Sequence, residues 1–236
     1  GIVSSYLYPN VWLIKTDSNG DTLWTNTFGG SNYDWGESVQ QTTDGGYIIT
    51  GATHSYGNGG SNVWLIKTDL IGDTLWTKTF GADGGSDEIG YSVQQTTDGG
   101  YIIAGTWLIK TDSLGNEEWI NENIDYDWGE SVQQTTDGGY IITGGISGPN
   151  GYPDAKLIKT DSNGDSLWTQ SFGGNENDQG HSVQQTTDGG YIIAGETRSF
   201  GNGIQDVWII KTDANGDSLW TKTFGGSDSD EGYSIQ

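Results

Sequence analysis

Short runs rich in β-branched and aromatic residues recur along the chain, and polar, glycine-rich segments separate them. In one stretch these runs are ESVQQT (37–42), YIITGAT (47–53), VWLIKT (63–68) and DTLWTKTF (73–80). Such residues favour strands, and no segment shows a sustained helical period. The pattern therefore predicts an all-β fold.

Two kinds of turn join these strands. TDGG follows the first strand, and its glycines are typical of a tight hairpin. TDSNGD joins the third strand to the fourth and places Gly20 where a positive φ is expected. The position of Asn19 holds Ile71 in another unit, and isoleucine has no oxygen to bind a cation. We therefore interpret this segment as a turn rather than a calcium loop.

The same unit repeats. QQTTDGG begins at residues 40, 94, 133 and 184, and Gln236 matches Gln94 as a fifth start. These starts lie 39 to 54 residues apart, and a period of this size indicates blades or solenoid units. Four antiparallel strands per repeat are typical of a β-propeller.

The two ends of the chain are in complementary phase. Residues 1–28 supply a second, third and fourth strand, with Ile2 and Val3 where Ile192 and Ile193 stand in the last repeat. Residues 232–236 supply a first strand. We therefore predict one domain, residues 1–236, that forms a five-bladed propeller closed by a blade shared between the termini, which leaves no sheet edge open. The alternative is a fragment of a longer array.

The repeat LWTKTFGG…SVQQTTDGGYIIAG resembles the β-propeller repeats that occur in tandem in secreted bacterial and archaeal proteins. KTDSNGDTLW is also similar to the blade motif of quinoprotein-like propellers, and five-bladed lectins share the architecture. The resemblance covers nearly the whole chain. It implies the propeller fold and an extracellular or cell-surface location.

Composition narrows the choice of partners. The formal net charge is −23, and this field repels nucleic acid and anionic membranes. No apolar run is long enough to span a membrane, and the chain has no cysteine for disulfide or thiol chemistry. We expect a monomer without membrane insertion.

Three sets of equivalent residues are interpreted as structural. Tryptophans of the fourth strands are expected to pack between blades. Tryptophans of the third strands, Trp12 among them, are expected in the core. Lysines at the ends of the third strands are expected to form ion pairs with nearby aspartates. The fourth-strand set is Trp24, Trp76, Trp119, Trp168 and Trp220, and the lysines are Lys15, Lys67, Lys110, Lys159 and Lys211.

One acidic residue stands two positions before the glycine that leads into each first strand. These residues are Asp34, Glu88, Asp127, Asp178 and Asp230. Because first strands line the axis of a propeller, the five carboxylates are expected to ring one mouth of the channel. A tight ring favours a hard cation, and Ca²⁺ is the candidate; no other cofactor is expected. The alternative is a set of turn-capping acids.

Variable positions beside this ring, and the loops between second and third strands, are the candidate ligand-binding surface. A rigid frame that carries variable aromatic loops is typical of recognition. The candidate residues are Trp35, Trp128, Tyr56, Tyr152, Phe200, Tyr91, His181 and Tyr233.

Enzyme chemistry has little support in the sequence. The two histidines, His54 and His181, lie in or beside variable loops, and no catalytic triad, metal-ligand spacing or phosphate loop occurs. We therefore expect a non-enzymatic extracellular binding or scaffold module for a glycan or a protein. Alternatives are a glycoside-processing enzyme that uses the channel-mouth carboxylates, and a purely structural repeat of a larger surface protein.

Ring closure can be tested by deletion of residues 232–236. In a closed ring these residues pair antiparallel with residues 1–5, so their loss leaves an unpaired edge. We expect the shortened chain to lose cooperative unfolding or to aggregate, as followed by thermal melting and light scattering. An unchanged melting curve with a monomeric state would contradict the shared blade.

Overall fold

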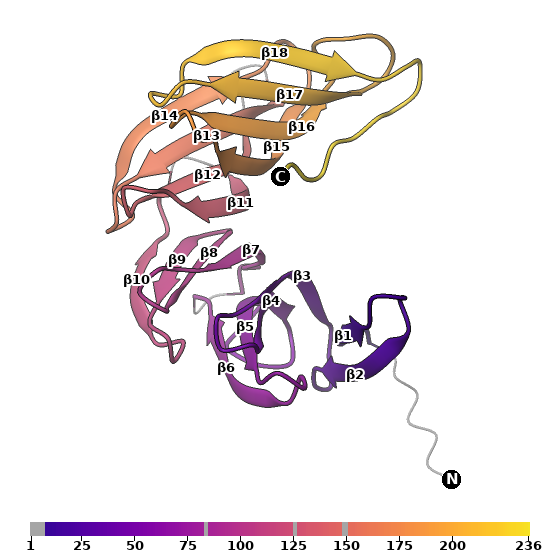
Figure 1. Cartoon of the computed structure of the whole chain (residues 1–236), viewed down its shortest axis with the longest axis vertical. Helices are drawn as coiled ribbons and strands as arrows, with labels where there is room; N and C mark the ends of the chain where they lie inside the picture. The colour runs from indigo at the N-terminus through magenta and orange to yellow at the C-terminus, as the bar shows by residue number, and fades with distance from the viewer. Residues whose placement is uncertain (1–7, 83–84, 125–126, 148–150) are drawn as a thin grey trace. The chain divides into compact units, whose positions relative to one another are not determined.

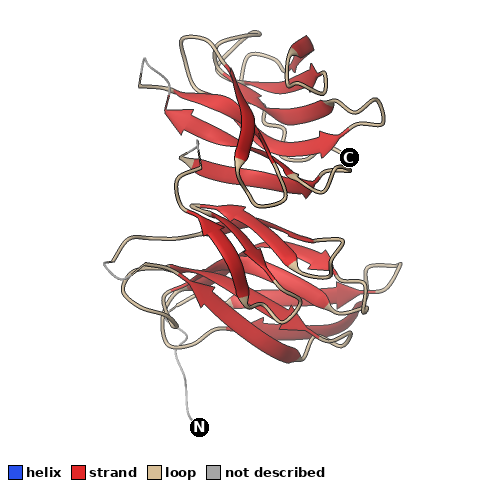
Figure 2. Ribbon diagram, turned by 90° about the vertical axis from the view of Figure 1, so that its left-hand side faces the viewer, coloured by secondary structure: helices blue, strands red, loops and turns tan. Residues whose placement is uncertain are grey.

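The computed structural model describes residues 8–82, 85–124, 127–147 and 151–236. Within these ranges all regular structure is strand (Figure 2). Among the same residues no helix is long and apolar enough to cross a membrane. The chain is therefore all-β, as the strand pattern predicts.

The described strands form five antiparallel sheets, four with four strands and one with two, and neighbours in each sheet follow chain order (Figure 1). The sheets are β1 (Val11–Thr16) and β2 (Thr22–Phe28); β3 (Asp34–Gln41), β4 (Tyr47–Thr53), β5 (Asn62–Thr68) and β6 (Thr74–Phe80); β7 (Gly90–Gln95), β8 (Tyr101–Gly105), β9 (Leu108–Thr111) and β10 (Glu117–Asn121); β11 (Trp128–Gln134), β12 (Tyr140–Ser147), β13 (Pro153–Thr160) and β14 (Ser166–Phe172); β15 (Asp178–Gln185), β16 (Tyr191–Thr197), β17 (Asp206–Thr212) and β18 (Ser218–Phe224). The four-strand unit predicted from the sequence is confirmed.

The chain divides into two compact units. The first consists of residues 1–105 and 110–118, and the second of residues 106–109 and 119–236. The single closed ring stays a prediction of the sequence.

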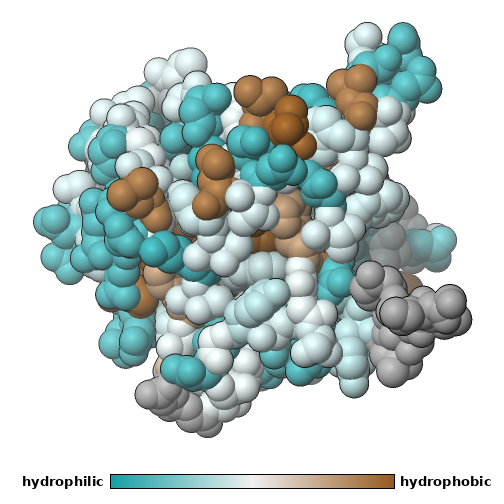
Figure 3. Space-filling model, turned by 90° about the horizontal axis from the view of Figure 1, so that it is seen from below, coloured by the Kyte–Doolittle hydropathy of each residue, from teal (hydrophilic) through white to brown (hydrophobic). Residues whose placement is uncertain are grey.

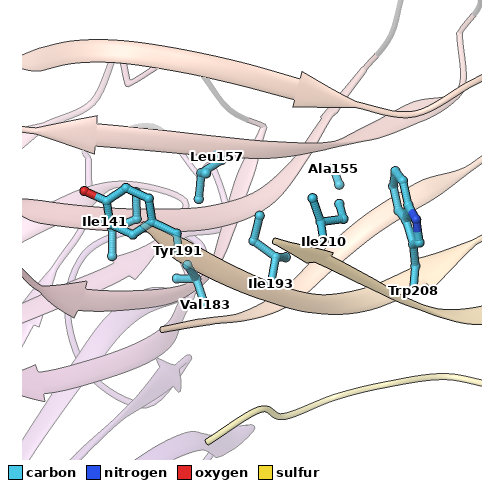
Figure 4. Close-up of a cluster of buried hydrophobic side chains, with 8 residues drawn as sticks. All are labelled: Ile141, Ala155, Leu157, Val183, Tyr191, Ile193, Trp208 and Ile210. Atoms are coloured by element: carbon cyan, nitrogen blue, oxygen red, sulfur yellow. The ribbon is translucent and has the colours of Figure 1, made fainter. Parts of the chain in front are cut away.

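Each unit has a core between neighbouring sheets. In the second unit the core joins side chains of β12 and β13 to those of β15, β16 and β17, and Figure 4 shows them facing one another. In the first unit Val11 and Phe28 of the two-stranded sheet pack against Trp64 of β5. Exposed apolar side chains stand in small groups among hydrophilic ones on the face seen in Figure 3.

The predicted inter-sheet role of the fourth-strand tryptophans is confirmed within each unit. Trp24 of β2 packs edge-on against Tyr47 of β4, with ring centroids 5.7 Å apart. Trp168 of β14 lies 5.7 Å from Tyr191 of β16, with the rings tilted at 60°. The pairs Trp76–Tyr101 and Trp119–Tyr140 repeat the contact. Such ring pairs contribute about 0.5–1.5 kcal/mol beyond their buried area.

The turn glycines complete this contact. Gly20, Gly72, Gly115, Gly164 and Gly216 all have positive φ, as the sequence predicts. Four of these turns also lie on the tryptophan of the preceding sheet. A Cβ at Gly72 would stand 2.6 Å from the Trp24 ring, and one at Gly164 would stand 2.6 Å from Trp119. Glycine is therefore required both by the backbone and by the packing.

First strands of neighbouring sheets are tied by side chains of the repeated SVQQ segment. The backbone amide of Gln95 donates to Gln40 Oε1 at 2.6 Å, and the backbone amide of Gln185 donates to Gln133 Oε1 at 2.6 Å. The Val183 amide likewise donates to Ser131 Oγ at 3.3 Å. These bonds explain why this segment repeats almost unchanged.

The lysines form ion pairs as expected, but with the turn between first and second strands. Lys67 is buried, and its Nζ lies 2.8 Å from Asp44 Oδ2 and donates to the Thr68 carbonyl at 2.8 Å. Lys110, Lys159 and Lys211 pair with Asp98, Asp137 and Asp188. Lys15 differs, since its Nζ lies over the Tyr47 ring at 5.6 Å from the centroid. The other four lysines therefore anchor the hairpin between the first and second strands of their sheet.

The ends of the described chain depart from this pattern. Trp12 is expected in the core but is 65% exposed, because among the described residues β1 pairs only with β2 and is an edge strand. Trp220 of β18 is 42% exposed. Beyond β18 the chain turns back along its own unit, where Ser229 bridges Gln205 and the Ile235 amide donates to Ser182 Oγ at 3.3 Å. Residues 232–236 thus contact β15 as first strands contact one another. Their predicted partner, residues 1–5, lies outside the described residues.

The double role of the turn glycines can be tested in the second unit. Gly164→Ala should destabilise by about 2–4 kcal/mol, because it adds backbone strain and a clash with Trp119. Gly138→Ala is the matched control, since Gly138 also has φ near 86° but no atom stands within 4 Å of an added Cβ. It should cost only the strain, about 1–2 kcal/mol. Equal losses in urea unfolding would show that the tryptophan contact contributes nothing.

The Asp44–Lys67 pair predicts acid sensitivity. Hydrogen bonds from Lys67 and Thr42 lower the pKa of Asp44 from 3.8 to about 2. A lowered folded-state pKa stabilises above pH 3.8, and this contribution is lost as pH falls through 2. Because the carboxylate is 58% exposed, we expect on the order of 1 kcal/mol. Asp44→Asn should therefore cost this much at pH 6 and little at pH 2, and a difference independent of pH would contradict the assignment.

Candidate functional site

A buried aspartate holds the loops at one end of the sheet β3–β6. Asp34 has no exposed surface, and its Oδ2 accepts hydrogen bonds from the Gly30 amide at 2.8 Å and from Ser55 Oγ at 2.6 Å. Its Oδ1 accepts from Thr53 Oγ1. The loop before β3 and the loop after β4 are thereby joined through one side chain.

The second unit repeats this brace in the sheet β15–β18. Asp178 is also fully buried, and it accepts hydrogen bonds from Gly174 N at 2.9 Å, Ser199 Oγ at 2.6 Å and Thr197 Oγ1. Asp178 thus bonds to Thr197 and Ser199, which lie 19 and 21 residues further along the chain. These bonds fix the ends of β15 and β16 whatever the sequence of the loop that follows β16.

The other acids of the predicted ring lie in related but looser settings. Asp127 is exposed and accepts from the Ser147 amide at 2.8 Å and its hydroxyl at 2.5 Å. Glu88 is 2% exposed and accepts from Ser86 Oγ at 2.6 Å, and Asp230 accepts from the Gly226 amide at 2.9 Å. Each acid therefore bonds to neighbouring loop groups.

These contacts give the acids a structural role. In the parts of the chain that the structure describes, no three His, Cys, Asp or Glu side chains are grouped so that they could hold a metal ion. Both carboxylate oxygens of Asp34 and of Asp178 already accept hydrogen bonds. Calcium binding stays a prediction of the sequence.

The variable positions next to the acids lie in a repeated β-bulge. The register between first and second strands shifts at Gly36/Ser38, Gly90/Ser92, Gly129/Ser131 and Gly180/Ser182. The residue inside the bulge is Glu37, Tyr91, Glu130 or His181. A bulged residue leaves the ladder, so its side chain can change without loss of strand pairing. This explains why the position varies while its neighbours repeat.

An aromatic cluster gathers around the Asp34 brace in the first unit. Tyr8 and Tyr33 are in edge contact at 4.7 Å, and they are 41% and 46% exposed. Tyr33 lies 6.4 Å from the His54 ring, and Trp35 lies 5.6 Å from the same ring. We name Tyr8, Tyr33, Trp35 and His54 the aromatic cluster. The backbone of this cluster is fixed beside Asp34, since the His54 amide donates to the Tyr33 carbonyl at 2.8 Å.

Other candidate aromatic residues take separate positions. Tyr56 lies 5.5 Å from the buried Trp64 ring and donates to the Gly29 carbonyl at 3.0 Å. Phe200 repeats the ring contact, 5.4 Å from Trp208. Tyr152 is 46% exposed. Tyr91 and Trp128 are half-buried.

A polar cluster occupies the equivalent end of the sheet β15–β18. The buried Gln205 donates through Nε2 to Glu196 Oε2 at 2.6 Å and to Glu231 Oε1 at 3.0 Å, and its Oε1 accepts from Arg198 Nε at 3.0 Å. The candidates His181 and Tyr233 belong to it, with their rings 5.3 Å apart. Tyr233 also donates to Glu231.

The electrostatics of His181 follow from this polar cluster. Burial lowers its pKa, but the carboxylates of Glu196, Glu130 and Glu231 outweigh burial, so the pKa is raised above 6.5. Its Nε2 lies 3.4 Å from Glu196 Oε2. The surrounding carboxylates thus favour the protonated form of the imidazole.

The sequence missed several members of both clusters. Tyr8, Tyr33 and His54 were not candidates, although Tyr33 precedes Asp34 and His54 opens a variable loop. Glu196 and Gln205 were missed too, and their signal was their difference from Ala52 and Ser61 at the equivalent positions. Comparison of the repeats position by position would have found them.

No family model and no curated protein matches the sequence. Solved structures do match. A protein of unknown function from Bacteroides caccae has 12% identity and a TM-score of 0.57 over 90% of this chain and 77% of its own. The WD40 β-propeller domain of Doa1 has 12% identity and a TM-score of 0.51 over 95% of this chain and 78% of its own.

Sqt1 from Chaetomium thermophilum has 12% identity and a TM-score of 0.56 over 95% of this chain, which spans only 55% of the Sqt1 chain. At these identities the likeness concerns the fold alone. Together with the repeated four-stranded sheets, it shows that the chain has the β-propeller fold.

Proposed function

We propose that the protein is a non-enzymatic binding module of an extracellular or cell-surface setting, and that it recognises a glycan through the aromatic cluster. The observation that carries the proposal is the exposure of Tyr8 and Tyr33 around a fully buried brace, Asp34. Aromatic faces with polar tips suit the alternating C–H and hydroxyl surfaces of sugars. Because the loops are fixed before binding, little ordering entropy is lost.

Two features favour binding, one over glycoside processing and one over a purely structural role. A general acid or nucleophile needs a carboxylate that reaches the substrate. Asp34 and Asp178, instead, are fully buried, and hydroxyl and amide donors occupy their oxygens. A purely structural role, in turn, gives no reason for exposed aromatic side chains at a position where another sheet has Asn177.

The repeat offers a variant that removes the aromatic cluster and keeps the frame. Tyr33→Asn with Trp35→Gln installs the residues Asn177 and Gln179 of the equivalent loop in the second unit. The double variant should fold normally, because that loop carries the same brace. Loss of two ring contacts should weaken binding at least about tenfold.

The measurement is binding to a glycan array, followed by titration of the best ligand, with melting curves for each variant. Tyr152→Ala is the matched control, since Tyr152 is 46% exposed, as is Tyr33, but lies in another loop. Weakened binding by the double variant alone supports the proposal. Equal binding by all variants, or no glycan bound while a protein partner is captured, overturns it.

A further inference from the structure

A cavity in the first unit lies beside the loop that carries Tyr56. Its volume is about 360 Å³, within the range of small-molecule sites and near its lower end. Three aromatic side chains line it, Phe28 at the end of β2, Tyr56 and Trp64. Gly29 and three threonines, Thr27, Thr74 and Thr77, complete the lining.

The lining combines two kinds of surface. Phe28 and Trp64 are 8% and 3% exposed, so their rings are held by the core, and Tyr56 packs on Trp64 at 5.5 Å. Thr27, Thr74 and Thr77 are exposed and supply hydroxyl groups that both donate and accept. None of the lining residues is charged. In addition, the buried indole N–H of Trp64 has no acceptor among the described residues.

These properties select the ligand. Threonine hydroxyls disfavour a purely apolar molecule, which would leave them without hydrogen bonds. An anion finds no basic partner there and meets a chain of net charge −23. A pyranose ring has apolar C–H faces for the aromatic side chains and equatorial hydroxyls for the threonines. The volume suits one ring rather than a long chain.

The cavity shares its frame with the aromatic cluster. The Tyr56 amide donates to Thr53 Oγ1 at 3.2 Å, and Thr53 Oγ1 itself donates to Asp34. The Gly29 carbonyl, which accepts from the Tyr56 hydroxyl, precedes Gly30, whose amide donates to the same aspartate. One buried carboxylate therefore positions both the exposed rings and the wall of the cavity.

We propose that this cavity is a sugar-binding subsite that takes one uncharged pyranose ring, with the ring stacked on the aromatic wall and its hydroxyls bonded to the threonines. The inference rests on the proposed function, because it assigns a pocket for one residue of the recognised glycan. It also adds a separate prediction, binding of a free monosaccharide.

The test uses calorimetric or NMR titration with the methyl glycosides of glucose, galactose, mannose and N-acetylglucosamine. At least one of them should bind the wild-type protein with a Kd on the order of 1 mM. Thr27→Val with Thr77→Val removes two hydroxyls and keeps the shape of the wall, and it should weaken this binding at least about tenfold. Thr25→Val is the control, an exposed threonine of the same strand that does not line the cavity.

The outcomes separate this subsite from the aromatic cluster. Weakening by the Thr27/Thr77 variant, but not by Thr25→Val, supports the subsite. Failure of all four glycosides to bind, or equal binding by both variants, overturns it. Loss of glycan binding in the Tyr33/Trp35 variant with no monosaccharide binding would leave the proposed function standing and the subsite refuted. A melting curve for each variant checks that any loss of binding does not come from misfolding.

Discussion

The contact between a fourth-strand tryptophan and the next sheet is the constraint on which the rest of this structure depends. An isolated four-stranded sheet has no core, so each one must bury its face against a neighbour. Trp168 does this with two partners at once, the ring of Tyr191 and the turn of Gly216. Because both partners come from the following repeat, one repeated unit specifies its own packing on the next.

A second feature, a buried aspartate, lets the loops vary without disturbing this packing. The Asp34 and Asp178 braces close the loop-bearing end of their sheets with hydroxyl and amide donors. A buried carboxylate with satisfied hydrogen bonds fixes the backbone, whereas an unsatisfied one would cost several kcal/mol. The side chains on either side of the brace are then not needed to fix the backbone, so their identity can vary. This is why Tyr33 and Asn177 can occupy the same place in two otherwise similar repeats.

The sequence predicted those features that depend on near neighbours along the chain. Strand pattern and turn glycines are local, and Gly20 and its equivalents have the expected φ. Contacts that cross a loop were harder. Asp34 was identified by its regular offset, but its partners Thr53 and Ser55 lie 19 and 21 residues away, beyond a hairpin. The aromatic cluster joins Tyr8 to His54, and no local pattern could place these side chains together.

The two units show what such a frame allows. At equivalent positions the first unit carries Tyr33, Trp35 and His54, whereas the second carries Asn177, Gln179 and Arg198. The first set offers aromatic rings, and the second accompanies a network of carboxylates around Gln205. Their chemistry differs although their backbones are held by the same brace. If the protein binds a ligand as proposed, recognition is therefore a property of single loops rather than of the repeat, and two repeats with the same brace need not bind the same ligand.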